Sequence, residues 1–253
     1  ARYGACKWDM ADGYTDYMLG APSASGQVVR AVSDSGYGSS PGNPMEMLNW
    51  NNTETPAMGR MTLPVMRVVN GRKSSAHQTD TSGFWCKKAV PQADVRPNPV
   101  DRVPYNMEDS YFAVAAIGIA TKDSSGLVFQ ASQTEASHAC ELAFSKGQPV
   151  VRWEDAKGRK VELTGPDKLA TNKLSVLSFT CAPEEQTLRV NSALADSGSA
   201  TFAPGNFSQM LLGWGFKNYY PQEGFTGNIY AVITGKGVPT PSELEILERY
   251  LRG

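Results

Sequence analysis

From residue 110 to its last residue, the chain repeats short apolar or alternating segments separated by turn-forming residues. Alternation with a period of two puts successive side chains on opposite faces of a strand, and this spacing is typical of an all-β sandwich. No segment with helical periodicity separates them, which excludes a parallel β-α-β order and favours antiparallel sheets packed face to face. The predicted strands are residues 111–119, 127–131, 138–144, 149–153, 159–163, 174–181, 187–191, 210–214 and 227–234.

One short α-helix is expected at the C-terminal end of the chain. Thr240 is a suitable N-cap, Pro241 occupies the first helical position and Glu243 completes a capping box. We expect the helix to lie across an end or edge of the sandwich and to shield it from water. The apolar stripe that it would bury consists of Leu244, Leu247 and Leu251.

Residues 1–105 have a different pattern, in which loop-forming residues dominate. Residues 91–104 contain four prolines, and only residues 28–32 and 63–69 resemble strands. The sequence therefore predicts a loop-rich N-terminal part (1–105) and a sandwich (106–253). The pattern leaves open whether the first part packs on the sandwich, contributes strands to it or forms a small irregular extension.

The charge balance removes several classes of partner. The 24 Lys and Arg residues against 25 Asp and Glu give a net charge of -1, so the chain lacks the cationic excess typical of proteins that bind nucleic acid or acidic membranes. No apolar stretch approaches the roughly 20 residues of a membrane helix. Residues 111–120 come nearest, and Gly118 interrupts them. Neither nucleic-acid binding nor membrane insertion is predicted.

The four cysteines, Cys6, Cys86, Cys140 and Cys181, include no Cys-x-x-Cys pair, which excludes zinc-finger spacing. Two disulfides are one interpretation. Pairing Cys6 with Cys86 and Cys140 with Cys181 is then preferred, because each bridge stays within one half of the chain. The alternative is four reduced thiols that act as small buried hydrophobic groups.

Three segments of the C-terminal part carry a family pattern. Residues 174–180 and 187–194 look like paired strands, and residues 210–214 (Met-Leu-Leu-Gly-Trp) look like a third family strand. The most specific segment is 225–233, Phe-Thr-Gly-Asn-Ile-Tyr-Ala-Val-Ile, followed by the capped helix at 242–251. On these segments about 120 residues resemble the concanavalin A-like superfamily, in particular the laminin G-like (LamG) domains of bacteria and phages.

This resemblance implies a two-sheet jelly roll over residues 106–253. Ser192 stands where the family usually has the glycine of a turn, which leaves the type of that turn open. The resemblance implies little about the ligand, because the fold serves glycan binding, protein adhesion, virion decoration and polysaccharide cleavage alike.

Catalytic patterns of the superfamily are absent from the sequence. The E-x-D-x-x-E strand of the glucan hydrolases is absent. Arg152-Trp153-Glu154 is only weakly similar to a strand motif of the alginate lyases. His77 and His138 accompany no nucleophile motif. A lyase or glycosidase with dispersed residues, such as these histidines or Tyr219, remains the alternative function.

The segment most suggestive of binding is the aromatic loop at residues 214–225. Aromatic faces stack on sugars, and amide groups can bind hydroxyls, although Trp214 and Phe225 could instead pack in the core while the tyrosines brace a long loop. The candidate ligand-binding residues are Trp214, Phe216, Asn218, Tyr219, Tyr220 and Gln222.

No metal site and no cofactor are predicted, but calcium remains open because some LamG domains hold one. Four aspartates lie near predicted turns without the spacing of a calcium loop, namely Asp9, Asp12, Asp16 and Asp196.

The leading hypothesis is a non-catalytic recognition or structural module, extracellular or on a cell or virion surface. Its loops would bind a glycan or a protein surface. A homo-oligomer or an assembly in a virion is compatible with this role.

Overall fold

A computed structural model describes the strands, the helix and most of their connections. The described residues are 6–14, 22–29, 31–34, 45–47, 64–78, 83–87, 110–132, 139–155, 157–165, 169–201, 209–217, 220–221 and 224–253.

The elements are almost all strands. In chain order they are β1 (Cys6–Tyr14), β2 (Ala31–Asp34), β3 (Met45–Met47), β4 (Val65–Val69), β5 (Arg72–His77), β6 (Phe84–Lys87), β7 (Tyr111–Ile119), β8 (Gly126–Ser132), β9 (Ala139–Ser145), β10 (Gln148–Glu154), β11 (Lys160–Thr164), β12 (Ser175–Ala182), β13 (Glu185–Val190), β14 (Ala193–Gly198), β15 (Gln209–Leu212), β16 (Phe216–Lys217), β17 (Tyr220–Pro221), β18 (Gly227–Lys236) and α1 (Pro241–Arg252). The predicted all-β antiparallel sandwich with one short C-terminal helix is confirmed.

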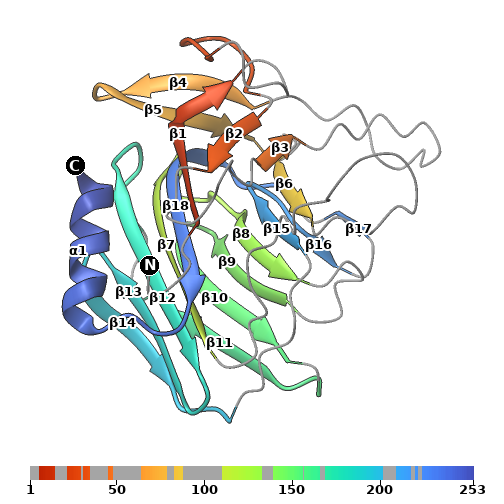
Figure 1. Cartoon of the computed structure of the whole chain (residues 1–253), viewed down its shortest axis with the longest axis vertical. Helices are drawn as coiled ribbons and strands as arrows, with labels where there is room; N and C mark the ends of the chain where they lie inside the picture. Colours follow the sequence, from red (N-terminus) through yellow and green to blue (C-terminus); the bar gives the residue numbers. More distant parts are fainter. Residues whose placement is uncertain are drawn as a thin grey trace, which may run out of the picture.

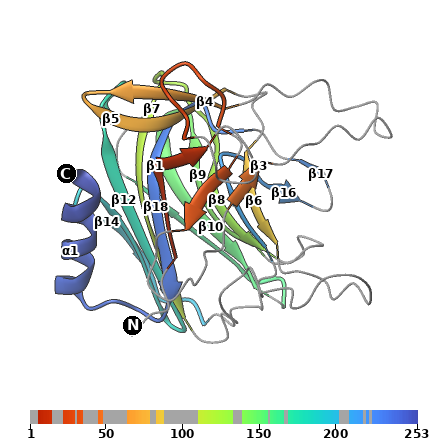
Figure 2. The same cartoon turned by 45° about the horizontal axis from the view of Figure 1, so that its top comes forward.

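Two antiparallel sheets form the sandwich (Figure 1). One has the order β1-β18-β7-β12-β13-β14, and the other has the order β11-β10-β9-β8-β15-β6. Hydrogen bonding runs from β1 through β2 and β3 to β6, so the sheets are joined along one edge. At the opposite edge the Thr164 N–H donates to the Asp196 carboxylate across 2.9 Å. Turning the molecule shows the β4–β5 hairpin over one end of the sandwich (Figure 2).

Strands from the first 105 residues belong to these same sheets. β1 and β5 pair with β18, and β6 pairs with β15. Trp8 and Met10 of β1 are buried in the main core. These pairings favour the alternative in which the N-terminal part contributes strands to the sandwich, while a domain boundary at residue 105 stays a prediction.

Strand β7 is buried on both faces, which explains its unbroken apolar sequence. The odd-numbered side chains, such as Ala113 and Ile117, face the core between the sheets. The even-numbered side chains, Phe112, Val114 and Ala116, belong to a second cluster under α1. The helix therefore lies on the outer face of this sheet, as Figures 1 and 2 show, and not across an end or edge of the sandwich as expected.

The capping box predicted for α1 is formed. The Glu243 N–H donates to the Thr240 hydroxyl, and the Thr240 N–H donates to the Glu243 carboxylate. Leu244 and Leu251 of the predicted stripe are buried, and Leu247 packs against them as a partly buried side chain. The sequence thus predicted the start of the helix and its apolar stripe. The expectation that Glu248 stays solvated is wrong, because the side chain is buried with the stripe.

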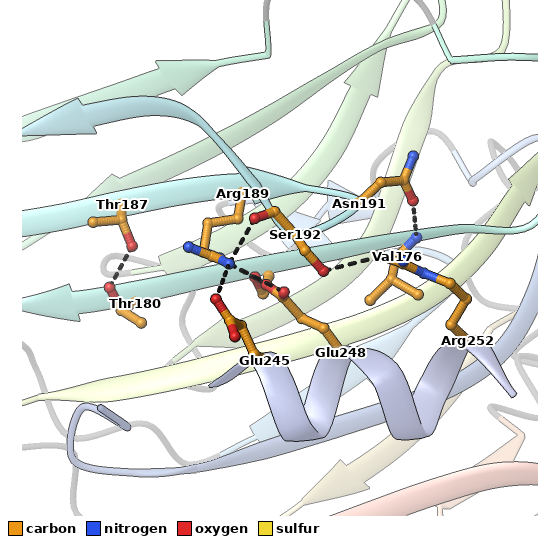
Figure 3. Close-up of polar contacts among 10 residues, drawn as sticks. Val176, Thr180, Thr187, Arg189, Asn191, Ser192, Glu245, Glu248 and Arg252 are labelled. Carbon is orange, nitrogen blue, oxygen red and sulfur yellow. Dashed lines mark hydrogen bonds and ion pairs between the residues drawn. The ribbon is translucent and has the colours of Figure 1, made fainter. Parts of the chain in front are cut away.

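A buried carboxylate docks the helix on β12 and β13. Glu248 is 1% exposed and accepts a hydrogen bond from Ser178. It also accepts bonds from Nε and Nη2 of Arg189, at 2.8 and 3.3 Å, and Figure 3 shows Arg189 beside Glu248. Burial acts to raise the pKa of Glu248, but the bonds from Arg189 and Ser178 outweigh it and hold the pKa below 4.5. The ion pair therefore keeps its charge inside the interface.

The sequence did not decide the type of the turn that contains Ser192. In the structure both central residues of this turn lie in the left-handed region. Asn191 has φ 50° and Ser192 has φ 72°, as the first and second positions of a type I′ turn between β13 and β14 require. The Ser192 carbonyl accepts a bond from Arg189, and its hydroxyl accepts one from Arg252. Serine therefore occupies a position that favours glycine and contacts the helix-docking network (Figure 3).

The structure does not contain the preferred Cys140–Cys181 disulfide. Both residues are buried free thiols. They lie in the core with Tyr111, whose hydroxyl interacts with both sulfhydryls, and burial raises the pKa of each thiol. For these two cysteines the alternative of reduced buried thiols is the one observed. The side chains of Cys6 and Cys86 lie outside the described residues.

Candidate ligand-binding site

The aromatic loop has its two ends fixed at one point on β8. The Gly213 N–H donates to the Val128 carbonyl, and the Gly213 carbonyl accepts the Phe225 N–H, both at 2.8 Å. Gly224 forms a bridge with Leu127. The loop therefore begins and ends against the first half of β8.

A pocket of about 280 Å³ opens beside this root. Its lining residues come from β8, β9, β10 and the turns that join them. They are Ser125, Gly126, Leu127, Glu141, Ala143, Phe144, Ser145, Lys146 and Arg152. Leu127 belongs both to the lining and to the bridge that fixes the loop, so the pocket and the loop root are adjacent.

The sheet face beside the pocket carries a row of polar side chains across four strands. Gln130, Glu141, Arg152 and Glu162 are register partners on β8, β9, β10 and β11. The Gln130 amide donates to Glu141 at 2.8 Å, and the Arg152 guanidinium donates to Glu162 at 2.8 Å. Hydrogen bonds along this row orient the carboxylate and the guanidinium that line the pocket.

These polar residues follow from strand alternation, although the sequence reasoning did not select them as ligand-binding residues. In β9 and β10 the core takes Cys140, Leu142, Val151 and Trp153, so the intervening positions face away from it. Glu141 and Arg152 occupy two of those positions. A search for polar residues at alternate positions of paired strands would have found them.

The predicted ligand-binding residues are only partly described. Trp214 is fully buried, and a Cβ on Gly83 would lie 2.0 Å from its ring, so Trp214 packs inside the protein as the core interpretation holds. Phe225 is also buried, against Phe144 at 5.6 Å between ring centroids. The main chains of Phe216 and Tyr220 lie in β16 and β17, but their side chains are outside the described residues. Asn218, Tyr219 and Gln222 also lie outside the described residues.

No model of a protein family matches the chain, and no curated protein matches it. Among solved structures, domain 4 of AbnA, an extracellular arabinanase of Geobacillus stearothermophilus in complex with arabinotriose, has a TM-score of 0.50 at 15% identity, over 73% of this chain and 81% of that one. The binding domain of botulinum neurotoxin DC in complex with SialylT has a TM-score of 0.56 at 8% identity, over 87% and 48%. The serotype G binding domain has a TM-score of 0.57 at 10% identity, over 97% and 50%.

The likeness shows a shared β-sandwich fold. This chain spans about half the length of the two neurotoxin structures. At such identities the comparison carries the fold and not the ligand, and a specific place among LamG domains stays a prediction.

A second polar pair lies inside the protein. The Ser75 hydroxyl is 2.8 Å from Nε2 of His77, which resembles the nucleophile and base of a hydrolase. Ser75 is fully buried and His77 is 3% exposed. Nδ1 of His77 has no hydrogen-bond partner in the described part of the chain, so no carboxylate of those residues orients the ring. The pair is closed to substrate in this structure. His138 lies outside the described residues.

Among the described residues, no group of three or more His, Cys, Asp or Glu could hold a metal ion. Of the four aspartates considered for calcium, Asp9 contacts Lys7 and the Ala11 N–H, and Asp196 accepts the N–H groups of Thr164 and Ser197. Within the described part, no helix is long and apolar enough to cross a membrane.

Proposed function

We propose that this protein is a non-catalytic glycan-recognition module that binds a saccharide between the β8–β10 pocket and the loop at residues 213–225. The observation that carries the proposal is the shared position of two features. The aromatic loop is rooted on β8 beside a polar pocket. Such a module would act outside the cell, on a cell surface or on a virion, where glycans and protein partners are available.

The chemistry of the site suits a sugar. Glu141 can accept hydroxyl protons, and Arg152, Lys146 and Ser145 can donate to ring and hydroxyl oxygens. Aromatic residues of the loop, such as Tyr219 and Tyr220, would supply flat apolar faces for the CH surface of the ring. Polar groups on a rigid sheet combined with aromatic groups on a loop therefore support recognition of a saccharide.

The comparisons support this proposal through the fold. Two of the similar domains were solved in complex with ligands whose names are arabinotriose and SialylT. The motifs at residues 174–194 and 225–233 support the finer assignment to a LamG-like jelly roll.

The pocket gives less support to a glycosidase. Most such enzymes place two carboxyl groups on either side of the bond that is cleaved. Glu141 is the one carboxylate among the described lining residues. We therefore propose binding rather than hydrolysis.

A glycan array that includes arabinan and sialylated oligosaccharides tests the proposal. Glu141→Gln should weaken binding of the best ligand by at least about tenfold, because a bond to a charged group contributes about 1.5–3 kcal/mol. Glu154→Gln is the matched control, since Glu154 lies on the same sheet face, paired with Lys160, and does not line the pocket. It should change binding by less than about twofold. No bound glycan, or equal loss in the two variants, would contradict the proposal.

A further inference from the structure

Gly213 holds the two ends of the aromatic loop together. Its N–H is bonded to β8 through Val128, and its carbonyl is bonded to the returning chain at Phe225. The φ angle of Gly213 is 82°, a conformation that other residues rarely adopt. The geometry at this residue therefore determines how the loop leaves the sandwich and returns to it.

The His77 ring packs directly against Gly213. A Cβ on Gly213 would lie 2.5 Å from Cε1 and 2.6 Å from Nδ1 of the imidazole, so the ring occupies the space that a side chain would need. The hydroxyl of Ser75 fixes the ring from β5, and Phe84 of β6 meets it edge to face at 5.9 Å. Strands of the N-terminal part therefore hold the ring that supports the root of the loop.

We propose that His77 is a positioning residue for the proposed glycan site. Its neutral imidazole supports Gly213 and keeps the two ends of the loop closed, and protonation of the ring loosens this root in acid. This inference rests on the proposed function, because the root that His77 supports borders the pocket proposed to bind the saccharide.

The surroundings of the ring make the neutral form the favoured one. The described neighbours of His77 include Ser75 on its own strand, Phe84 on β6, Gly213 after β15 and Gly227, its register partner on β18. None of them carries a charge that could stabilise an imidazolium. Burial accordingly lowers the pKa of His77 from 6.5 to about 3.

The pH dependence follows by linkage. The closed root favours the neutral His77 ring. The stability that this preference gives to the closed root is fully present above pH 6.5 and is lost as the pH falls from 6.5 toward 3. If opening exposes His77 to water, the ring there regains a pKa near 6.5. The population with an open root should then rise about 25-fold between pH 7 and pH 5.

Hydrogen exchange measured by mass spectrometry tests this inference without a ligand. In the wild-type protein, exchange of a peptide covering residues 212–226 should rise about 25-fold from pH 7 to pH 5 after correction for the intrinsic rates. A peptide covering β9 and β10 should show no such rise. His77→Gln should remove the pH dependence of the first peptide, and His138→Gln, a change of the other histidine, should keep it.

Three results would overturn the inference. They are a loop peptide whose exchange does not depend on pH, an equal rise in β9 and β10, and a dependence that persists in His77→Gln. If His77→Gln fails to fold, the wild type and His138→Gln still test the inference. In either protein, a loop peptide without pH dependence or an equal rise in β9 and β10 would contradict it. Because no glycan is used, this test can fail while the proposed function holds, and the array can fail while this test succeeds.

Discussion

The ion pair beneath α1 gives the sharpest prediction about stability. Glu248→Gln keeps the size of the side chain and removes its charge, which leaves Arg189 facing a neutral amide. Arg189 is 15% exposed and Glu248 is 1% exposed, so water cannot fully replace the lost interaction. Glu245 also faces Arg189, but it is 62% exposed and 4.0 Å away, which makes Glu245→Gln a matched control on the same helix.

Breaking a fully buried pair by removing one partner costs about 3–5 kcal/mol. Because Arg189 keeps some exposure and Gln can still accept a hydrogen bond, we expect Glu248→Gln to lower the free energy of unfolding by about 2–3 kcal/mol. Glu245→Gln should cost less than about 0.5 kcal/mol.

Urea unfolding followed by circular dichroism measures both variants, and Glu248→Gln should lower the midpoint by about 1 M. The sign of the pH dependence is also fixed. Since the pKa of Glu248 is lowered in the folded state, its stabilisation is fully present above pH 4.5 and is lost as the pH falls through the folded value. The gap between wild type and Glu248→Gln should therefore shrink in acid. Equal costs for the two variants, or a gap that widens in acid, would refute the reasoning.

Two further predictions concern the core. Trp8→Ala should lower the free energy of unfolding by about 3–5 kcal/mol, because the indole is fully buried on a strand between β18 and β2. Thermal or urea unfolding measures this loss. A loss below about 1 kcal/mol would mean that β1 is not part of the cooperative core. Cys140 and Cys181 should react with iodoacetamide only after denaturation, since both are buried thiols, and a disulfide-linked peptide in the mass spectrum would contradict the structure.

The later strands were predictable because their alternation matches a simple environment. Each of the nine predicted strands overlaps an observed one, and residues 111–119 agree at both ends with β7. β14 was missed because its sequence, Ala-Leu-Ala-Asp-Ser-Gly, lies at a sheet edge with Leu194 60% exposed. Where packing does not require apolar side chains, the period of two is weak.

The N-terminal strands were harder to predict because their partners are distant in sequence. β5 reads Arg-Lys-Ser-Ser-Ala-His, which shows little apolar alternation, yet it pairs with β18 through Ser75, Ala76 and His77. The candidate site also has a part that the sequence indicated and a part that depends on contacts between strands. Composition alone indicated the aromatic loop, whereas Glu141 and Arg152 meet only because β9 and β10 pair in a particular register.

The most direct test of the central claim is the location of a bound saccharide on the protein. Amide chemical shifts should be recorded during titration with the strongest ligand from the array. We predict shifts at Leu127, Glu141 and Arg152 and around Gly213 and Phe225, with no shifts in β12 and β13 beneath α1. Shifts confined to the helix side, or binding that leaves the β8–β10 face unchanged, would contradict the account.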